Sequence, residues 1–185
     1  MSRCESFPPL FAPDARVLVV GSMPGEASLR AAQYYAHPQN AFWRILYALW
    51  DAEPPAQYAA RVAFLRAHGI ALWDVARACD RVGSLDSGMR AVETNDFSAL
   101  LGAAPGIAQV FCNGGTAHAL FVRRVAPAFP GLAVTRLPST SPALTRPFAH
   151  KLAAWQAVRA ALAAGESARQ TNRPDDLNEA KEEMR

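Results

Sequence analysis

The sequence predicts an α/β fold, with a parallel sheet that carries helices on both faces. Short apolar runs alternate along the chain with segments whose apolar residues recur at helical spacing, and this alternation is typical of parallel sheets. The chain has 185 residues, of which 51% are hydrophobic, and this length and composition suit one domain with a sizeable core. We expect that domain to occupy residues 1–165.

The first half of the chain begins with a valine-rich run at residues 16–20, which predicts a buried strand that ends in a Gly/Pro turn. Asn40 precedes a segment with helical periodicity. Because asparagine is a favourable N-cap, a helix is expected over residues 41–51. The Pro-Pro pair at residues 54–55 prevents it from continuing. A second helix is expected over residues 56–68, closed by Gly69.

The second half repeats the alternation. Residues 70–75 predict a short strand or extended segment, and residues 80–95, which are polar and contain glycine, predict a long loop. Asn95 is a candidate cap for a helix that runs through Leu101. Further elements are expected in this order: a strand at 107–112, a helix at 116–125, a strand at 132–137, and a final helix from Pro147 to about Ala163.

Composition argues against several classes of protein. No apolar run reaches the roughly 18 residues of a membrane span, and the N-terminus does not resemble a signal peptide. Three widely spaced cysteines, Cys4, Cys79 and Cys112, fit a reducing cytoplasm and fall short of an iron–sulfur ligand set. No cluster of His, Cys and carboxylates has zinc-like spacing. We therefore expect a cytoplasmic protein that binds no membrane, metal or cofactor.

The chain is weakly basic, with 19 Lys and Arg against 16 Asp and Glu and a net charge of +3. Nearly all of its cations are arginines, whose planar guanidinium can donate two hydrogen bonds to one phosphate. A modest positive charge is also common in proteins that bind no nucleic acid, so charge alone decides nothing. Residues 166–185 are acidic and poor in apolar residues, which predicts a disordered tail.

Three chemically informative loops follow three of the predicted strands. They span residues 21–40, 113–115 and 138–142. The carboxyl ends of parallel strands lie at one edge of a sheet, and such folds bind their ligands there. The three loops should therefore converge on one site.

Each residue of these loops also has an ordinary structural explanation. Tyr35 could stack on a nucleobase, an interaction typically worth about 1–3 kcal/mol, or cover the core, whereas Tyr34 is expected in the core. Asn40 could cap its helix, or it could position a water with its carbonyl oxygen. An amide is no general base near neutral pH, so the second role suits cleavage of an N-glycosidic bond through an oxocarbenium-like state.

Each of the remaining polar residues also has two possible roles. The hydroxyls of residues 138–142 (PSTSP) could bind phosphates or close a turn. His37 could contact DNA or be structural, Asn113 could bind a base edge or fix the turn that follows it, and Arg146 could contact the DNA backbone or solvent. Nothing in the sequence pairs the three candidate acids Asp74, Asp86 and Asp96.

In combination, these motifs resemble those of the uracil-DNA glycosylase superfamily. Residues 21–25 (GSMPG) resemble its first motif, and residues 35–43 (YAHPQNAFW) resemble its aromatic-A-H-P-x-N-x-F-W run. Residues 113–114 (NG) and 137–141 (LPSTS) resemble its two later motifs. The order and spacing match over most of residues 16–160.

One departure separates the branches of this superfamily. Mismatch-specific members carry a water-positioning asparagine where this chain has Met23, which cannot do that job. The hypoxanthine-DNA glycosylase branch has a GSxPG loop and depends on the asparagine of its HPxN run, which matches Ser22 and Asn40 here. Three other segments also resemble that branch: residues 72–75 (LWDV), 83–87 (GSLDS) and 95–97 (NDF).

The resemblance implies a three-layer α/β/α domain with a central, mainly parallel four-stranded sheet. It implies a monomeric, monofunctional DNA glycosylase without metal or cofactor, which flips a deaminated base, above all hypoxanthine of deoxyinosine, into its pocket. Two alternatives stay open. One is a uracil-DNA glycosylase of broad or mismatch specificity, and the other is a non-catalytic DNA- or nucleotide-binding module.

The same resemblance distributes the roles among the residues of the loops. Asn40 would be catalytic and position the attacking water. The expected contacts to the base are Gly21, Ser22, Met23, Tyr35 and Asn113. The expected contacts to the rest of the DNA are Pro24, His37, Pro138, Ser139, Thr140, Ser141 and Arg146.

Overall fold

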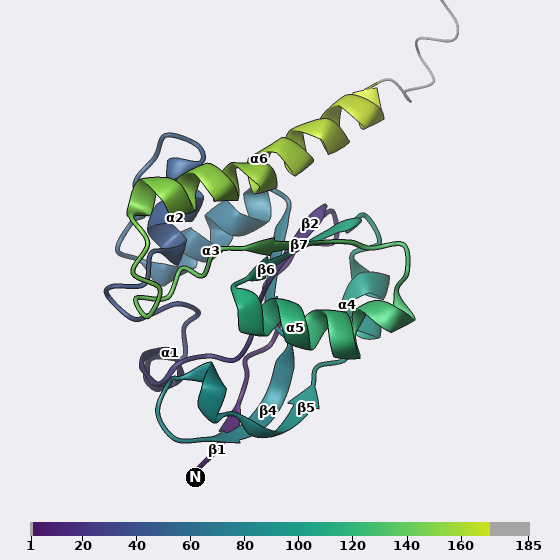
Figure 1. Ribbon diagram of the computed structural model, residues 1–185. Coiled ribbons are helices and arrows are strands. Elements are labelled where there is room, and N and C mark those ends of the chain that lie inside the picture. Colours follow the sequence, from purple (N-terminus) through teal and green to yellow (C-terminus); the bar gives the residue numbers. More distant parts are fainter. Residues whose placement is uncertain (1, 171–185) are drawn as a thin grey trace, which may run out of the picture.

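The computed structural model describes residues 2–170, with side chains described as far as residue 165 (Figure 1). Its strands are β1 (Ser2–Glu5), β2 (Val17–Gly21), β3 (Ile70–Asp74), β4 (Ala76–Arg81), β5 (Arg90–Thr94), β6 (Gln109–Asn113) and β7 (Ala133–Leu137). Its α-helices are α1 (Glu26–Ala31), α2 (Phe42–Ala48), α3 (Tyr58–Ala67), α4 (Phe97–Ala103), α5 (Gly115–Arg124) and α6 (Phe148–Gln170). Within this described part, no helix combines the length and the apolar character needed to cross a bilayer.

The central sheet has four strands in the order β3-β2-β6-β7, and all its neighbouring strands are parallel. β2 is buried along its whole length, which explains its continuous apolar run, since a parallel strand is covered on both faces. Helices α2 and α6 pack together on one face, and α4 and α5 lie on the other (Figure 1). The predicted three-layer fold with a four-stranded parallel sheet is confirmed.

Aromatic side chains join the helices to the sheet. Phe42 of α2 meets Trp155 of α6 edge to face, with ring centroids 5.8 Å apart. On the other face, Phe97 of α4 lies 5.4 Å from Phe121 of α5 and 5.0 Å from Trp73 of β3. The Phe97–Phe121 pair is also edge to face, whereas the Phe97–Trp73 pair is tilted, and ring contacts of this kind add to the burial of the rings. Phe42 and Trp155 thus join the two helices of one layer, and Phe97 joins the layer of α4 and α5 to β3.

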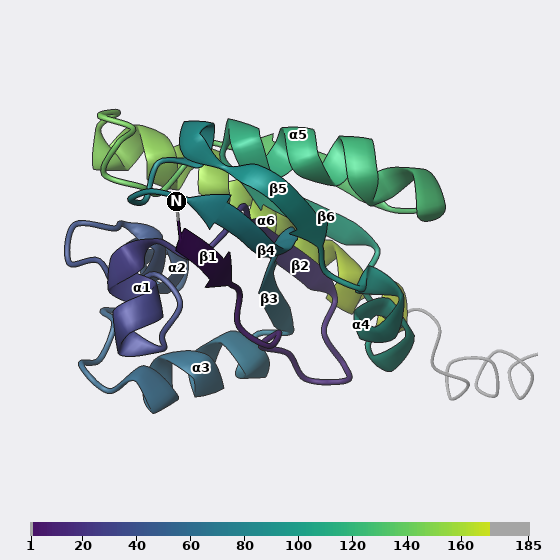
Figure 2. The same ribbon diagram turned by 90° about the horizontal axis from the view of Figure 1, so that it is seen from below.

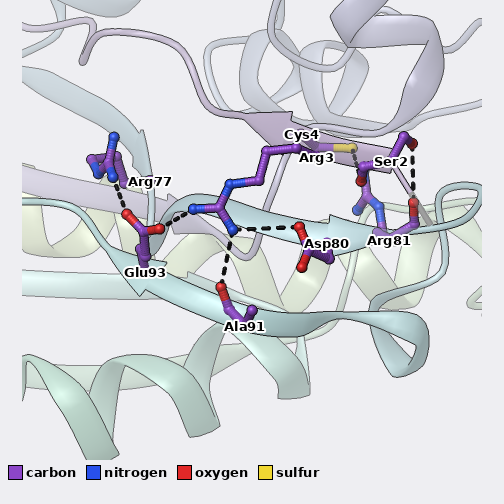
Figure 3. A network of polar contacts seen from close by, with 8 residues as sticks. All are labelled: Ser2, Arg3, Cys4, Arg77, Asp80, Arg81, Ala91 and Glu93. Atoms are coloured by element: carbon purple, nitrogen blue, oxygen red, sulfur yellow. Dashed lines mark hydrogen bonds and ion pairs between the residues drawn. The ribbon is translucent and has the colours of Figure 1, made fainter.

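A second, antiparallel sheet in the order β1-β4-β5 corrects the expectation of a long loop over residues 80–95. Figures 1 and 2 show it beside the carboxyl ends of the central strands. Arg3 on β1 forms ion pairs with Asp80 at 3.4 Å and with Glu93, and Arg77 also pairs with Glu93 (Figure 3). β5 is largely exposed, and β4 buries Arg81 beside small residues. Neither strand therefore shows the apolar alternation by which strands are recognised in sequence.

The helix starts also differ in part from expectation. α1 lies within the segment that was expected to be a loop. Asp96 caps α4, since its side chain accepts a hydrogen bond from the Ser98 amide at 3.0 Å. Asn95 instead donates to the Asp74 carbonyl at 2.8 Å. Here the tertiary contact of Asn95 prevails over its local capping tendency.

The final helix is longer than expected. α6 begins one residue after Pro147, and it continues to Gln170, past the expected end near Ala163. Residues 171–185 of the expected tail lie outside the described residues.

Candidate active site

A cavity of about 670 Å³ opens at the carboxyl edge of the central sheet. Its walls include the residues at or just after the ends of all four strands: Gly21 of β2, Asp74 of β3, Asn113 of β6, and the loop 139–144 that follows β7. The expected convergence of three loops is confirmed. The fourth contribution, from β3, was not expected.

The Asn113 side chain joins three of these walls. Its Nδ2 donates to the Tyr35 hydroxyl at 3.1 Å and to Thr140 Oγ1 at 2.9 Å. Its Oδ1 accepts from the Thr140 amide at 2.9 Å. Since the Thr140 carbonyl in turn accepts from the Ala41 amide at 3.0 Å, the network extends to the loop that contains Asn40.

Tyr35 occupies a constrained position in the cavity wall. Its backbone is in the left-handed region, with φ of +54°, which is uncommon for a residue with a side chain. Its ring stacks on Phe42 with centroids 3.9 Å apart. Burial, followed by the nearby Asp74 carboxyl, raises the pKa of Tyr35, so the phenol stays neutral. Tyr34 is buried in the core, as expected.

The first-motif loop, residues 21–25, lies against Asp74 and the segment between β4 and β5. A Cβ added to Gly21 would lie 2.3 Å from Asp74 Oδ1 and 3.1 Å from the Tyr35 hydroxyl, so only glycine fits there. Ser22 Oγ donates to Asp86 Oδ2 at 2.7 Å. The Met23 side chain packs with Cys79 in a small apolar cluster. Its thioether has no N–H or O–H group to offer the cavity.

Asp74 is a site residue that sequence reasoning recorded only as an unpaired candidate acid. Its carboxyl is buried and accepts a hydrogen bond from Ser6 Oγ at 3.1 Å. Burial raises the pKa of Asp74 to about 7, and the charge of Asp86 adds to that increase, while Ser6 and Arg81 oppose it. An acidic residue at the end of an apolar strand is a signal for a site residue. The role of Asp74 was not recognised because the residues around it come from segments that are distant in sequence.

Asp86, also recorded from the sequence as an unpaired candidate acid, lies in a segment, residues 84–87, that lines the cavity. Arg81 is fully buried beside it, with Nη1 3.9 Å from Asp86 Oδ1. The same guanidinium donates to the Pro24 carbonyl. Burial raises the pKa of Asp86 despite this cation and the hydrogen bond from Ser22. Pro24 thus helps to hold the loop in place through its backbone.

Asn40 lines the cavity and also stabilises the start of α2. Its Oδ1 accepts a hydrogen bond from the Phe42 amide at 3.0 Å, although the N-cap position itself is Ala41. A carbonyl oxygen has two lone pairs, so Oδ1 can accept one more hydrogen bond. His37 is exposed at the cavity, and its Nδ1 accepts from the Gln39 amide at 3.2 Å.

The serine loop is braced from behind by α6. Trp155 Nε1 donates to the Pro138 carbonyl at 3.0 Å, and Lys151 Nζ donates to the Ser141 carbonyl at 3.2 Å. Ser139 and Ser141 line the cavity and are partly exposed. Thr140 is 0% exposed, so its hydroxyl serves Asn113 and cannot reach a DNA phosphate, contrary to the role expected of it.

Gly114 allows the serine loop to approach β6 closely. Its φ is +99°, and an added Cβ would lie 3.0 Å from the Ser139 Cβ. Arg146 is exposed and does not line the cavity. Within residues 2–165, no three His, Cys, Asp or Glu side chains gather in a way that could hold a metal ion.

We predict that Gly21→Ala destabilises the protein by about 1–3 kcal/mol, because its methyl group would overlap the Asp74 carboxyl. Gly102→Ala is the matched control, since Gly102 lies in α4 with nothing within 4 Å of an added Cβ. The control should stabilise by roughly 0.5–1 kcal/mol. Urea unfolding of the two variants measures both effects, and equal stability of Gly21→Ala and wild type would contradict the assignment.

We also predict a pH dependence of stability from Asp74. Its pKa is about 7 in the native protein and about 3.9 in an unfolded chain, so the native state binds more protons between these values. The protonated Asp74 carboxyl therefore contributes to the free energy of unfolding in full below about pH 4, and this contribution is lost as the pH rises to about 7. Asp74→Asn has no such proton to lose. Its stability relative to wild type, measured by urea unfolding, should therefore increase between about pH 5 and about pH 8. A constant difference would refute this.

Similarity to known proteins agrees with this geometry. Residues 8–162 match the family model of the uracil DNA glycosylase superfamily. A hypoxanthine DNA glycosylase of Methanosarcina barkeri is 38% identical over 111 residues, covering 60% of this chain and 70% of the relative. A hypoxanthine DNA glycosylase of Methanosarcina acetivorans is 33% identical over 157 residues, covering 83% of this chain and 96% of the relative.

A solved structure is similar over nearly its whole length. It is the solution NMR structure of a protein of Methanosarcina acetivorans that was provisionally assigned as a uracil DNA glycosylase, with a TM-score of 0.76 and 31% identity. The similarity covers 87% of this chain and 99% of that one. The family match, the shared fold and the four-walled pocket together establish that this chain belongs to the uracil DNA glycosylase superfamily.

Proposed function

We propose that the protein is a DNA glycosylase that excises deaminated bases, with hypoxanthine in deoxyinosine as its preferred substrate. The observation that carries this proposal is the presence of Tyr35, Asn40 and Asp74 in the wall of one pocket. The two relatives named hypoxanthine DNA glycosylase support the choice of base. The Met23 side chain supports it too, because a thioether packed in an apolar cluster cannot position water from the first motif.

The pocket suits a planar base that carries an N–H donor. Hypoxanthine presents N1–H beside its O6 acceptor, and the buried Asp74 carboxyl at the end of β3 can accept a hydrogen bond from that N–H. The Tyr35 ring, supported by Phe42, offers an aromatic surface for stacking. Both N–H groups of Asn113 Nδ2 are bound, to Tyr35 and Thr140. Asn113 would therefore contact the base through the second lone pair of its Oδ1, which accepts one bond from the Thr140 amide.

Asn40 would act by positioning water. The hydrogen bond from the Phe42 amide fixes the orientation of its side chain, and the second lone pair of Oδ1 remains for a water molecule. That water would attack the anomeric carbon as the glycosidic bond breaks. Stabilisation of the cationic sugar would come from positioning and electrostatics. Free hypoxanthine and an abasic site would be the products.

The rest of the DNA would lie across the rim of the pocket. Ser139, Ser141 and His37, which line the pocket and are at least partly exposed, would donate hydrogen bonds to phosphates. Arg146, which is exposed beyond the pocket, would contact the backbone further along. Pro24 and Pro138 would shape the loops around the extruded nucleotide.

We infer that the enzyme acts as a monomer in the cytoplasm. The pocket is assembled within one chain, and Cys4, Cys79 and Cys112 are free thiols, as suits a reducing compartment.

The substrate assignment predicts inosine-dependent strand scission. Labelled oligonucleotides that contain deoxyinosine, uracil or xanthine would be incubated with the protein and then treated with alkali, which cleaves at abasic sites. Scission should be fastest with deoxyinosine. Scission with uracil alone would instead identify a uracil-DNA glycosylase, and binding without scission would identify a non-catalytic module.

We predict that Asn40→Ala lowers the rate of base excision by about 100-fold or more, because a misplaced water loses the benefit of positioning. It should also lose about 0.5–2 kcal/mol of stability with the bond to the Phe42 amide. Asp96→Ala is the matched control, since it removes an equivalent bond at the start of α4. The control should lose similar stability and keep full activity. Excision by Asn40→Ala at the control's rate would refute a catalytic role.

A further inference from the structure

Two of the three cysteines of the chain face each other across a pair of strands. β1 and β4 are antiparallel, and Cys4 lies directly opposite Cys79 in their register. The amide of Ser6, two residues after Cys4, donates to the carbonyl of Arg77, two residues before Cys79, at 2.8 Å. Because hydrogen-bonded and non-hydrogen-bonded pairs alternate along an antiparallel ladder, Cys4 and Cys79 also form a hydrogen-bonded pair, whose Cα atoms are about 5.5 Å apart.

This position suits a disulfide bond. The Cα atoms of bridged cysteines usually lie roughly 4.4–6.8 Å apart, and directly opposed residues project from the same face of a sheet. Cys4 and Cys79 accordingly pack in the same small apolar cluster, which also contains Met23. Cys4 Sγ donates a weak hydrogen bond to the Ser2 carbonyl at 3.7 Å (Figure 3). A rotation of the Cys4 side chain would exchange this contact for one with Cys79.

The two thiols differ in their access to solvent. Cys4 is partly exposed, whereas Cys79 is fully buried. Burial raises the pKa of the Cys79 thiol, although Arg81 opposes this effect, and the nearby Cys4 adds to it. A small oxidant from solvent would therefore meet Cys4 first, and Cys79 is the neighbouring thiol that can close the bond. The third cysteine, Cys112, is buried in the main core, outside this cluster.

We propose that Cys4 and Cys79 form a modification site, at which hydrogen peroxide converts the two thiols into an intramolecular disulfide. The Cys4 thiolate attacks one peroxide oxygen, and the O–O bond breaks to give a sulfenic acid and a hydroxide, which takes up the thiol proton as water. The Cys79 thiolate then attacks Cys4 Sγ, the S–S bond forms, and the hydroxyl leaves as a second water. Two thiols thus lose two electrons to one peroxide. A dithiol reverses the step by thiol–disulfide exchange.

The disulfide would tie the N-terminal strand to the sheet that holds the first-motif loop. β4 supplies Arg81, whose guanidinium donates to the Pro24 carbonyl, and Met23 packs in the cluster with Cys79. A bond between Cys4 and Cys79 closes a loop of about 75 residues, which restricts the unfolded chain more than the folded one. Oxidation should therefore stabilise the protein. This inference does not depend on the proposed function.

The first test counts thiols in the unfolded full-length protein before and after treatment with a small excess of hydrogen peroxide. Wild type should present three reactive thiols when reduced and one when oxidised, and dithiothreitol should restore all of them. The oxidised protein should be lighter by two hydrogen atoms, and digestion should release a peptide pair that joins Cys4 to Cys79. Cys4→Ser should keep both of its thiols. Cys112→Ala is the matched control and should lose both.

The second test measures whether the bond fits the native structure. Oxidation should raise the urea midpoint of wild type by about 1 M. The same shift is expected for Cys112→Ala, and none for Cys4→Ser, whose substitution at a partly exposed position should leave the fold intact.

Several outcomes would overturn the proposal. These are the survival of all three thiols in peroxide-treated wild type, a disulfide that includes Cys112, and a dimer linked through Cys4 on a non-reducing gel. Equal urea midpoints of the oxidised and reduced wild type would likewise contradict a bond that forms within the native fold. None of these results bears on base excision, so the proposed function is tested separately.

Discussion

Three hydrogen bonds of the Asn113 side-chain amide hold the pocket together, since it donates to the Tyr35 hydroxyl and to Thr140 Oγ1 and accepts from the Thr140 amide. They join the end of β6, the loop after β7 and the loop after β2, which are distant in sequence. Thr140 is fully buried, and a buried polar group that lost its partner would cost about 1–3 kcal/mol. The loops around the pocket therefore keep their arrangement before DNA binds, which favours a site that works by positioning.

The burial of ionisable groups beside the pocket reduces the stability of this arrangement. Asp74 is buried with a raised pKa, and burial raises the pKa of Asp86 as well. Arg81 offsets part of that effect from its own buried position. Such groups reduce stability, and proteins retain them at functional sites because binding requires them. The second sheet matters for this reason, since β4 supplies Arg81 and the segment after β4 supplies Asp86.

Much of the fold followed from the chain itself. Residues 17–21 are a buried valine-rich run and residues 42–48 have helical periodicity, so these elements were predicted within a few residues. The β4–β5 hairpin was missed because its charged residues pair with one another across strands, as Arg77 does with Glu93. The roles of Asp74 and Thr140 were missed or misjudged because neither residue has its partners nearby in sequence.

The sequence by itself determined the parallel α/β architecture, the loops that form the site and the family to which the chain belongs. These depend on periodicity, turn residues and short motifs, which act over a few residues. Only the tertiary structure decided the role of each polar side chain. Thr140 is committed to Asn113 and Asp74 is buried with a pKa near 7, because burial and hydrogen-bond partners arise only when distant strands pack together.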